Sequence, residues 1–426
     1  MEQPVRVGLL GCGNVGTALV RLVAERADAV AARTGVRLEI ARVAVRDLTK
    51  ARGVELAAGV LTDDAASVVR DPEVDVVIEL IGGVETARSL LLDALRAGKP
   101  VVTANKELLA HAGAELFEMA ARSGVDLLFE AAVGGGIPII RPLRESLVGE
   151  RVRRITGIVN GTTNYILTRM SEDGAGYADA LADAQRLGFA EPDPTADVEG
   201  LDAGAKLAIV ASIAFGASVA AGDVHREGIA SVTAEDIDVA HRLGYEVKLL
   251  AVAEQDDDGR IAVRVHPAMV PVTHPLATVR DAFNAVFVEG DAVGPLMFYG
   301  RGAGGGPTAS ALLGDLVDAA TNLGRGAASG PRPLPPARIR PIDELRSEYY
   351  LDLEVVDRPG VLHAVSGVFA EHGVSIRSME QQGLGDEARL VFITHEAVEA
   401  SVQATLADLR ELEVVDRVAS VLRVLS

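Results

Sequence analysis

The first 140 or so residues alternate short apolar runs with helical patterns. We expect strands over Val5–Leu10, Leu38–Val45, Val74–Leu80, Pro100–Thr103 and Val125–Glu130. The segments between them predict helices over Gly16–Arg33, Ala65–Arg70, Ala87–Gly98 and Glu107–Gly124. These strands are apolar at successive positions, as are strands that are buried on both faces. The alternation predicts an α/β domain over residues 1–140, built on a doubly wound parallel sheet.

Residues 141–306 follow a different pattern, with a helical middle and then several strands. We expect helices over Ala178–Leu187, Leu201–Phe215 and Ala234–Leu243. Hairpins are predicted from Glu246–Glu254 with Arg260–His266, and from Ala285–Glu289 with Val293–Tyr299. This indicates an α+β domain for catalysis, substrate binding and dimerisation. A last long helix, Pro307–Leu323, could return to pack on the first domain.

The C-terminal part begins with a segment rich in Gly, Pro and Arg over residues 324–347, which predicts an extended, exposed linker. Residues 348–426 then show the order strand, helix, strand, strand, helix, strand. The strands are expected at Tyr349–Val355, Ser375–Gln382, Glu387–Thr394 and Val414–Leu425, and the helices at Val361–His372 and Ala397–Glu411. This order predicts a compact ferredoxin-like βαββαβ domain.

Composition narrows the class of protein. The chain has 426 residues, 49% of them hydrophobic, and a net charge of −20, which argues against a nucleic-acid partner. The uncharged run Leu207–Gly222 is shorter than the roughly 18 residues that suggest a membrane span, so we expect a buried helix and no membrane partner. Cys12 is the single cysteine, and no charged n-region or cleavage site precedes the first strand. We therefore expect a cytoplasmic protein.

The first chemical motif is GCGNVG, which directly follows a strand and opens a helix. Gly11 suits the tight turn, Gly13 lets the backbone approach a pyrophosphate, and Gly16 lets helix and strand pack closely. The helix N-terminus favours the phosphate charge. The motif predicts a Rossmann-type NAD(P) site whose contacts would be made by Gly11, Gly13, Asn14, Val15 and Gly16.

The choice between NADP and NAD is usually made at the end of the second strand. Arg46 and Lys50 lie there and favour the 2′-phosphate of NADP. Asp47 would suit the ribose hydroxyl of NAD, so NADP(H) is preferred and NAD(H) stays open. A solvated charge cluster is the alternative interpretation of these three residues.

Two lysines are candidates for chemistry. Lys106, in TANKELLA, follows a predicted strand at the edge where doubly wound folds bind ligands, although it could equally be a lysine at a helix start. Asp202 and Lys206 are spaced i, i+4 and so share a helix face. Because the next residues are apolar on every face, we expect a buried ammonium beside a carboxylate, a costly arrangement that indicates function. The preceding loop is rich in acidic residues, namely Glu191, Asp193, Asp197 and Glu199, and a site for a substrate ammonium would use such carboxylates.

The stretch from Ala184 to Lys206 resembles the signature of homoserine dehydrogenases, which ends in Gly-x-Asp-x-x-x-Lys. The other landmarks of that family follow in order: GCGNVG, TANK, FEAAVGGGIPII, NGTTNYIL and GRGAGGGPTASA. The resemblance covers Val5 to about Leu323. It departs at Ala104, where many members have proline, and this puts little in doubt.

The resemblance implies a role for each matching residue. Lys206 would be the acid/base for the homoserine hydroxyl, with Asp202 orienting it and helping to hold substrate. Glu191 would bind the substrate ammonium, and Lys106 would assist at the reacting oxygen or the nicotinamide. The expected reaction is the NAD(P)-dependent interconversion of L-homoserine and L-aspartate 4-semialdehyde, in the biosynthesis of threonine, methionine and isoleucine.

The resemblance also implies a monovalent cation, typically sodium, held mostly by backbone carbonyls, which suit a hard ion. The matching positions are Glu130, Val133, Gly135 and Ile137. The alternative is a plain glycine loop between strand and helix. NGTTNYIL predicts a loop entering a helix, with Thr162, Thr163 and Asn164 as caps or substrate contacts. Gly302, in the second glycine loop, is expected to be a further cofactor contact, and a simple crossover between domains is the alternative.

Residues 349–426 resemble an ACT domain, marked by VVDRPGVLHAVSGVFAEHGVSI. In that family amino-acid effectors bind near the Asp-Arg-Pro-Gly turn, often at a dimer interface, and in homoserine dehydrogenases the effector is commonly threonine. The matching residues are Asp357, Gly360, Val361 and Leu362. We expect a homo-oligomer, at least a dimer. The alternative is a dimerisation module without a ligand.

Two other functions compete. A sister amino-acid dehydrogenase would share the N-terminal domain, but a covalent semialdehyde dehydrogenase would need a cysteine in the middle of the chain, and Cys12 lies in the nucleotide loop. A non-catalytic NAD(P) or amino-acid sensor would have no need of an acid/base such as Lys206. We therefore favour the enzyme.

Overall fold

The computed structural model describes residues 4–330, 333–383 and 387–425, and the chain forms two compact units. Unit 1 comprises Met1–Ile155, Ala205–Asp223 and Asn284–Ala337. Unit 2 comprises Thr156–Gly204, Val224–Phe283 and Arg338–Ser426. The chain thus returns to unit 1 twice after leaving it, and each unit is described by itself below.

Unit 1 contains a six-stranded parallel sheet in the order β3-β2-β1-β4-β5-β6. The strands are β1 (Val5–Leu10), β2 (Leu38–Ala44), β3 (Leu61–Thr62), β4 (Val76–Glu79), β5 (Val101–Thr103) and β6 (Leu127–Leu128). This confirms the predicted doubly wound sheet. The last strand is shorter than expected, because Glu130 already begins a 3-10 turn, η1 (Glu130–Ala132), and η2 (Pro142–Ser146) follows.

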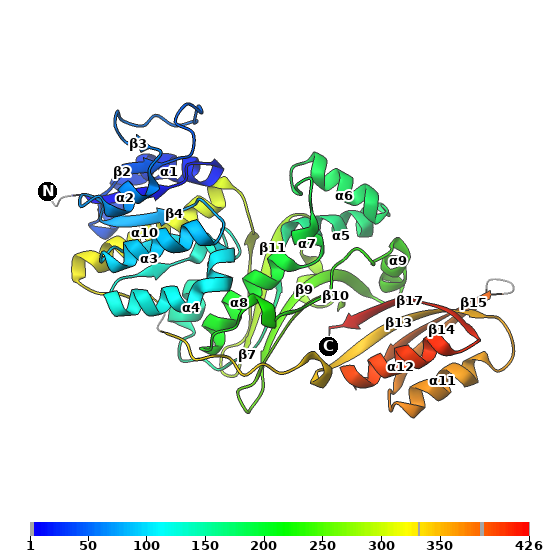
Figure 1. The fold of residues 1–426 in the computed structure, drawn as a ribbon. Coiled ribbons are helices and arrows are strands. Elements are labelled where there is room, and N and C mark those ends of the chain that lie inside the picture. Colours follow the sequence, from blue (N-terminus) through cyan, green and yellow to red (C-terminus); the bar gives the residue numbers. More distant parts are fainter. Residues whose placement is uncertain (1–3, 331–332, 384–386, 426) are drawn as a thin grey trace. The chain divides into compact units, whose positions relative to one another are not determined.

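Helices cover both faces of this sheet. They are α1 (Asn14–Thr34), α2 (Ala65–Arg70), α3 (Glu85–Arg96), α4 (Lys106–Ser123) and α10 (Gly305–Arg325). Figure 1 shows α3 and α4 on one face and α1 with α10 on the other. Leu19 and Val23 of α1 share a core with Leu312 and Leu316 of α10. The late helix α10 is therefore part of the core of the parallel-sheet domain.

Other parts of the chain complete unit 1. They include the hairpin strands β11 (Phe283–Gly290) and β12 (Gly294–Arg301), most of α8 (Leu201–Phe215), η3 (Ala221–Asp223) and the first half of β7 (Val152–Ile158). The segment expected to be an extended linker, residues 324–347, is shorter than expected, because α10 ends at Arg325 and β13 begins at Arg346. Asp126 accepts hydrogen bonds from the backbone of Ser329 and Gly330, so the start of the segment is bonded to unit 1. Pro331 and Arg332, which we also assigned to the linker, lie outside the described residues.

Unit 2 begins with helices and continues with an antiparallel pair of long strands. The helices are α5 (Gly161–Asp173), α6 (Tyr177–Arg186), α7 (Thr195–Val198) and α9 (Ala234–Arg242). The other elements are β8 (His225–Arg226), β9 (Tyr245–Gln255), β10 (Ile261–Pro271) and η4 (Pro275–Thr278). Strands β9 and β10 pair in antiparallel register from Gln255 and Ile261 outward, which confirms the predicted hairpin.

The C-terminal part of unit 2 is the βαββαβ domain that the sequence predicted. Its elements are β13 (Arg346–Val356), α11 (Val361–Glu371), β14 (Ile376–Gly383), β15 (Glu387–Thr394), α12 (Glu399–Glu411) and β17 (Val415–Val424), with the short η5 (Ile342–Glu344) and β16 (Ala397–Val398) beside them. The strand order is β17-β13-β15-β14. Strand β17 also pairs in parallel with β10, where Ala268 faces Arg423, so this domain continues the β9–β10 sheet.

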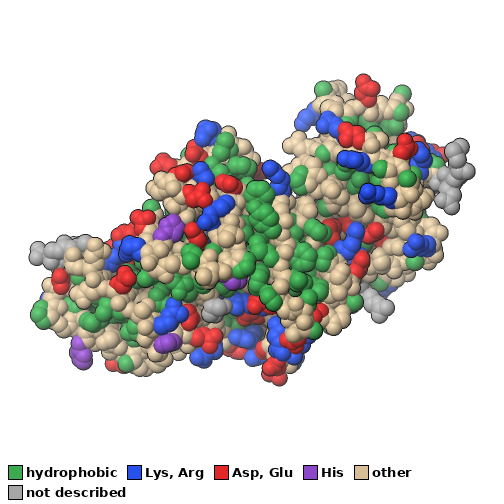
Figure 2. Space-filling view, turned by 180° about the vertical axis from the view of Figure 1, so that it is seen from behind, with side chains coloured by type: hydrophobic (Ala, Val, Ile, Leu, Met, Phe, Trp, Pro, Cys, Tyr) green, Lys and Arg blue, Asp and Glu red, His purple; other side chains and the backbone are tan. Residues whose placement is uncertain are grey.

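The charged side chains on the surface are mixed. On the face seen in Figure 2, Lys and Arg lie among Asp and Glu and form no continuous basic area over the residues drawn in colour. Within the described part of the chain, no helix is both long enough and apolar enough to cross a membrane.

Candidate active site

The loop Gly11–Gly16 joins β1 to α1, and its glycines occupy places that side chains could not. Gly11 has φ +96°, and a Cβ there would lie 2.6 Å from the carbonyl oxygen of Leu80. A Cβ on Gly16 would lie 2.5 Å from the carbonyl oxygen of Gly11, so helix and strand approach through this residue. Around Gly13, at the N-cap of α1, a Cβ would meet nothing within 4 Å. The loop therefore offers bare backbone at the start of a helix, as a pyrophosphate site requires.

The second glycine loop lies against the first. Gly305 opens α10, and a Cβ there would lie 3.3 Å from the carbonyl oxygen of Asn14. At Gly302 a Cβ would collide with the amide of Asn284, a side chain that is only 1% exposed. Gly302 is thus required by packing on Asn284, while residues 304–306 approach the nucleotide loop.

The charged residues Arg46 and Asp47 follow β2 and are exposed, but their hydrogen bonding differs. Asp47 accepts hydrogen bonds from the backbone and hydroxyl of Thr49, at 2.8 and 2.7 Å. The hydrogen bonds from Thr49 lower the pKa of Asp47. The Asp47 carboxylate is therefore engaged in its own turn, whereas Arg46 is an exposed cation at the same strand end.

Lys106 is the first residue of α4, next to the helix cap Asn105. The Asn105 amide accepts from the Leu108 backbone and donates to the carbonyl of Gly83. Beneath it lies Glu79, which is fully buried and accepts hydrogen bonds from Thr103 and from the backbone of Ile81 and Gly82. Our sequence reasoning missed Glu79, although a carboxylate that ends a buried apolar strand is a readable signal.

Asp202 and Lys206 lie one turn apart at the start of α8, as expected. The helix is buried beyond them: Leu207, Ala208, Ile209, Val210 and Ala211 are all at most 5% exposed. Lys206 itself is partly exposed, which corrects the expectation of a fully buried ammonium. An amine at the border of a buried helix can reach a substrate from solvent-accessible space, as a proton-transfer group must.

The helices that carry the two lysines face each other in unit 1. A small cavity of about 70 Å³ is lined by α4 residues from Leu109 to Phe117 and by Ile209 and Ser212 of α8. Each lysine precedes its helix's first lining residue by three positions. Each lysine therefore lies about one helical turn before the cavity between α4 and α8.

The acidic loop and the NGTT motif meet in unit 2 through one side chain. The amide nitrogen of Asn160 donates to Asp197 at 2.6 Å and to Asp202 at 2.9 Å. Its oxygen accepts from the backbone of Thr163, so Asn160 is the N-cap of α5. We had expected Thr162, Thr163 or Asn164 to be the cap, and a search for N-cap residue types could have found Asn160.

The remaining acidic residues of this loop are exposed. Glu191 presents its side chain to solvent, and its carbonyl accepts from the amide of Gln185 at 3.2 Å. Asp193 is bonded to Thr195, which lowers its pKa. Thr162 donates to the carbonyl of Phe189, the residue two positions before Glu191. The loop is thus anchored next to Glu191, whose carboxylate faces solvent.

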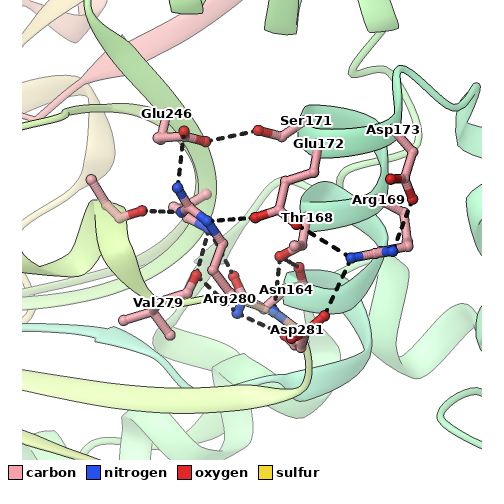
Figure 3. Close-up of polar contacts among 12 residues, drawn as sticks. Asn164, Thr168, Arg169, Ser171, Glu172, Asp173, Glu246, Val279, Arg280 and Asp281 are labelled. Carbon is pink, nitrogen blue, oxygen red and sulfur yellow. Dashed lines mark hydrogen bonds and ion pairs between the residues drawn. The ribbon is translucent and has the colours of Figure 1, made fainter.

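Asn164, the last polar residue of the NGTTN run, serves the fold. Its amide donates to the carbonyl of Asp281 at 2.8 Å (Figure 3). It also donates to the carbonyl of Phe283 at 3.2 Å, and these bonds hold a loop where Asp281 has φ +54°. The ammonium of Lys248, only 1% exposed, donates to Asn164 and to the carbonyl of Val279. Burial lowers the pKa of Lys248 to about 8, and Arg280 adds to this effect.

The four positions expected to bind a cation, Glu130, Val133, Gly135 and Ile137, are buried in one loop. The Glu130 carboxylate already accepts three backbone hydrogen bonds, from Ile139 and Ile140 at 2.6 and 2.8 Å and from Arg141. The backbone carbonyl of Glu130 accepts one long hydrogen bond, from Val133 at 3.4 Å. A Cβ on Gly135 would lie 2.4 Å from the carbonyl oxygen of Gly302, so the loop from Glu130 to Ile137 touches the loop that contains Gly302.

Asp315 supports the same loop from α10, and our sequence analysis gave no hint of it. It accepts the backbone N–H of Glu130 at 2.8 Å. Burial raises the pKa of Asp315 to about 7, despite that hydrogen bond and the nearby guanidinium of Arg141. A return helix therefore supplies the carboxylate that fixes the start of the glycine loop.

In the C-terminal domain, the four expected effector residues lie around one cavity of about 460 Å³. Asp357, Gly360, Val361 and Leu362 line it together with Gln381 of β14. Gly360 has φ +97° at the N-cap of α11, a conformation that favours glycine. The turn thus brings together a carboxylate, a helix N-terminus and apolar side chains.

A buried ion cluster links this domain to β8. Arg423 of β17 donates to Glu399 at 2.8 Å and to both oxygens of Glu227 at 2.8 Å. Burial alone would lower the pKa of Arg423, but the carboxylates outweigh it and raise that pKa. Burial would raise the pKa of Glu227, yet His225 and Arg423 hold it at about 2. Two carboxylates and one guanidinium therefore stay ionised inside unit 2.

Comparison with protein families gives three matches. Residues 11–130 match the NAD-binding domain of homoserine dehydrogenase, and residues 138–317 match the homoserine dehydrogenase family itself. Residues 349–414 match the ACT domain. These confirm the nucleotide-binding and ACT assignments made from the sequence.

Relatives match over nearly the whole chain. A homoserine dehydrogenase of Mycobacterium tuberculosis is 51% identical, covering 99% of this chain and 98% of its own length. One of Corynebacterium glutamicum is 49% identical, with 98% and 95% covered. The crystal structure of a homoserine dehydrogenase from Thiobacillus denitrificans has a TM-score of 0.94 at 42% identity, covering 100% of this chain and 99% of that one. A hyperthermophilic archaeal homoserine dehydrogenase in complex with NADPH has a TM-score of 0.63 at 28% identity, covering 74% of this chain and 98% of its own. The chain therefore belongs to the homoserine dehydrogenase family of NAD(P)-dependent oxidoreductases.

Proposed function

We propose that Lys206 is the acid/base of the homoserine dehydrogenase reaction and that Asp202, one turn before it, orients the lysine and holds substrate. The supporting observation is α8, which begins with these two residues and is buried beyond them. A nicotinamide cofactor, when bound, accepts the hydride from the carbinol carbon. Lys206 would take the proton from the hydroxyl oxygen on that carbon, and would return it to the carbonyl oxygen when the semialdehyde is reduced.

The other substrate contacts that we propose are those implied by the resemblance, and the loop geometry supports them. Glu191, exposed beside the anchored Phe189, would bind the α-ammonium. Lys106, at the start of α4, would lie near the reacting oxygen or the nicotinamide. The shared cavity of α4 and α8 supports this, because each lysine precedes a lining residue by three positions.

NADP(H) is the cofactor we propose, with NAD(H) as a weaker substitute. Gly11, Gly13, Asn14, Val15 and Gly16 would hold the pyrophosphate, with Gly302 in the second glycine loop. Arg46 would meet the 2′-phosphate, because Asp47 is engaged by Thr49 and is a poor partner for a ribose hydroxyl. The archaeal neighbour that holds NADPH supports this choice.

A monovalent cation, sodium by resemblance, fits the loop from Glu130 to Ile137. The backbone carbonyls of Glu130, Val133, Gly135 and Ile137 would hold it, since the Glu130 carboxylate is engaged elsewhere. The Asn284 amide, buried beside Gly302, has no hydrogen-bonding partner among the described residues and adds a polar group next to this loop. The ion would order the loop rather than take part in proton transfer.

The cavity around Asp357 would bind an amino-acid effector, which we propose to be threonine. Its carboxylate and helix N-terminus suit the two charged ends of an amino acid. The response would travel through β17, because Arg423 contacts Glu227, and Gly228 packs on the backbone of Val198 and Glu199 at the end of the acidic loop.

We also propose that the chain works as a homo-oligomer, at least a dimer. Strand β12 and its turn expose Val293 at 39% and Tyr299 at 54%, at the end of the strand order. An apolar edge of this kind favours a partner surface. Sedimentation of the purified protein tests this directly.

The first experiment is the absorbance of NAD(P)H with L-homoserine, measured with NADP and NAD in parallel. Reduction that depends on homoserine is the expected result, with a higher kcat/KM for NADP. Arg46→Ala should shift this ratio towards NAD. No reduction with either cofactor, at high pH and with sodium or potassium present, would refute the proposal and favour the sensor or a sister amino-acid dehydrogenase.

The effector is tested in the same assay with threonine added. We expect threonine to change the rate in the wild type and to lose its effect in Asp357→Ala. Deleting the whole domain would be a poorer test, because β17 pairs with β10 and its loss would expose that strand. A threonine response that survives Asp357→Ala would refute the assigned cavity.

A further inference from the structure

Glu79 links the ends of two neighbouring strands of the parallel sheet. It is the last residue of β4, and its exposed fraction is 0%. One oxygen of its carboxylate accepts the backbone N–H groups of Ile81 and Gly82, at 2.8 and 3.0 Å. The other oxygen accepts the hydroxyl of Thr103, the last residue of β5, at 2.7 Å. Each oxygen therefore holds a different strand end.

The link continues into α4, the helix that begins with Lys106. The hydroxyl oxygen of Thr103, which is also fully buried, accepts the backbone N–H of Asn105 at 3.0 Å. The Asn105 amide caps α4 and donates to the carbonyl of Gly83 at 2.7 Å. These contacts form a closed ring from Glu79 through Thr103 and Asn105 back to the loop after β4. The start of α4 is thereby fixed relative to that loop.

The loop that Glu79 holds also touches the nucleotide loop. A Cβ on Gly11 would lie 2.6 Å from the carbonyl oxygen of Leu80. Gly82 and Gly83 have φ +70° and +72° and are exposed, so the loop after β4 offers bare backbone. Because the strand order reverses between β1 and β4, ligands of doubly wound folds bind at the carboxyl ends of these strands. Glu79 thus fixes exposed backbone at the edge of the sheet where the cofactor is expected.

We propose that Glu79 is a positioning residue, which fixes Lys106 relative to the exposed backbone of Gly82 and Gly83 and so aligns substrate with the nicotinamide. This rests on the proposed function, in which Lys106 lies near the reacting oxygen or the nicotinamide. Transfer between two bound molecules depends steeply on their alignment, and a misplacement of about 1 Å can lower the rate about 10²-fold. Glu79 therefore acts on the rate through the start of α4.

The carboxylate is required in place of the corresponding amide. A glutamine could keep its oxygen on the N–H groups of Ile81 and Gly82. Its NH₂ group would then face Thr103, whose hydroxyl has a single hydrogen to donate and would lose the acceptor for it. Glu79→Gln therefore breaks the link to β5 and keeps the link to the loop after β4.

The test compares Glu79→Gln with Thr103→Val, which breaks the same hydrogen bond from the other side. We expect kcat for homoserine oxidation to fall at least about tenfold in each variant, because Lys106 is no longer held in place. The dissociation constant of NADPH should stay within about threefold of the wild type, since the nucleotide loop keeps its own contacts. Thr103→Ser keeps the hydroxyl and should retain most of kcat.

The matched control is Asp126→Asn. Asp126 is 1% exposed and also accepts three hydrogen bonds, from the amide of Asn322 and the backbone of Ser329 and Gly330. It directly precedes β6, so it lies at the opposite edge of the parallel sheet from Glu79. We expect both Glu79→Gln and Asp126→Asn to lower the melting temperature by a few degrees, but only Glu79→Gln to lower kcat.

A double-mutant cycle tests whether the effect passes through Lys106. If Glu79 acts by positioning this lysine, adding Glu79→Gln to Lys106→Ala should lower kcat by less than about threefold further. An undiminished tenfold loss in that background would overturn the proposal.

Amide hydrogen exchange gives a readout that needs no substrate. In Glu79→Gln the backbone N–H groups of residues 105–108 should exchange faster, because the start of α4 has lost its anchor. Exchange in the nucleotide loop should stay as in the wild type, and Asp126→Asn should change neither region. Unchanged exchange at residues 105–108 in Glu79→Gln would show that Glu79 does not hold the start of α4.

The outcomes separate this inference from the proposed function. If the wild type does not oxidise homoserine, or if Lys106→Ala keeps the kcat of the wild type, the proposed function fails and the role of Glu79 fails with it. If both requirements are met and Glu79→Gln lowers kcat no more than Asp126→Asn does, only the inference is wrong. Should Glu79→Gln not fold, Thr103→Val and Thr103→Ser decide the question in the same way.

Discussion

In the nucleotide loop of unit 1 the positions that shape the loop are glycines, which have no side chain. Around Asn160 in unit 2, by contrast, the contacts are made by a side-chain amide. Gly16 is needed because a Cβ would lie 2.5 Å from the carbonyl of Gly11. Asn160 is needed because its amide reaches two carboxylates. Adding atoms should damage the first region, and removing polar atoms should damage the second.

A second contrast exists within unit 2, between a buried cation that has carboxylate partners and one that has only neutral partners. Arg423 is surrounded by the carboxylates of Glu227 and Glu399 and keeps its charge. Lys248 is bonded to a neutral amide and a carbonyl, and its pKa falls to about 8. Burial is tolerated in both cases, but only the paired cation is charged at every physiological pH.

The largest effect is expected at Lys206, the side chain that we propose moves the proton. Lys206→Ala should lower kcat by roughly 10²–10⁴-fold, as expected for a general acid/base, while NADPH binding followed by fluorescence stays the same. Lys206→Arg should not rescue the rate, because a guanidinium does not give up its proton near neutral pH. An unchanged kcat would show that Lys206 is not the acid/base.

The next largest effect is expected at the paired cation. Arg423→Met would leave Glu227 and Glu399 without their guanidinium, which should lower the free energy of unfolding by about 3–5 kcal/mol. Its control lies on the same strand: Arg417 pairs with Glu354 at the surface, and Arg417→Met should lower it by less than about 1 kcal/mol. Urea unfolding of both variants measures the difference, and equal losses would contradict our view of the cluster.

Lys248, the buried cation without a carboxylate partner, should make the free energy of unfolding depend on pH. Because the folded pKa of Lys248, about 8, lies below its ordinary value of 10.5, the unfolded chain binds more protons between these pH values. Lys248 therefore lowers stability below pH 8, and this penalty is relieved as pH rises towards 10.5. The full change is at most about 3 kcal/mol.

Lys248→Met removes that titration. Relative to the variant, the wild type should gain stability steadily from pH 8 to 10.5, as measured by urea unfolding at each pH. Other groups that titrate in this range cancel in the difference. A difference that does not vary with pH would mean that Lys248 stays protonated, and that its neutral partners suffice to hold the charge.

The smallest effect is expected where one methyl group is added. Gly16→Ala should weaken NADPH binding by about tenfold and lower the melting temperature, since the Gly11 carbonyl must move. At Gly13 a Cβ meets no protein atom, so Gly13→Ala should weaken NADPH binding alone. If both variants bind NADPH like the wild type, the loop does not hold the cofactor as we propose.

Much of this architecture is encoded locally and was predicted from the sequence. The parallel sheet, helix α8, the hairpin β9–β10 and the ACT domain follow from hydrophobic periodicity, which reports which faces of each element are buried. GCGNVG was equally readable, because Gly11 and Gly16 are required by the backbone of a single turn. Asp202 and Lys206 were found because one helix carries both at a spacing of four residues.

The contacts that join distant segments were decided only by the tertiary structure. Asp315 accepts the backbone of Glu130 from 185 residues away, and β17 extends the sheet of β10. Asn160 reaches Asp197 and Asp202 across 37 and 42 residues. No local pattern reports such pairs, since periodicity shows that a residue is buried but not against what. The local sequence thus determined the elements and placed Asp202 and Lys206 on one helix, and the packing of those elements decided how the carboxylates around them are held.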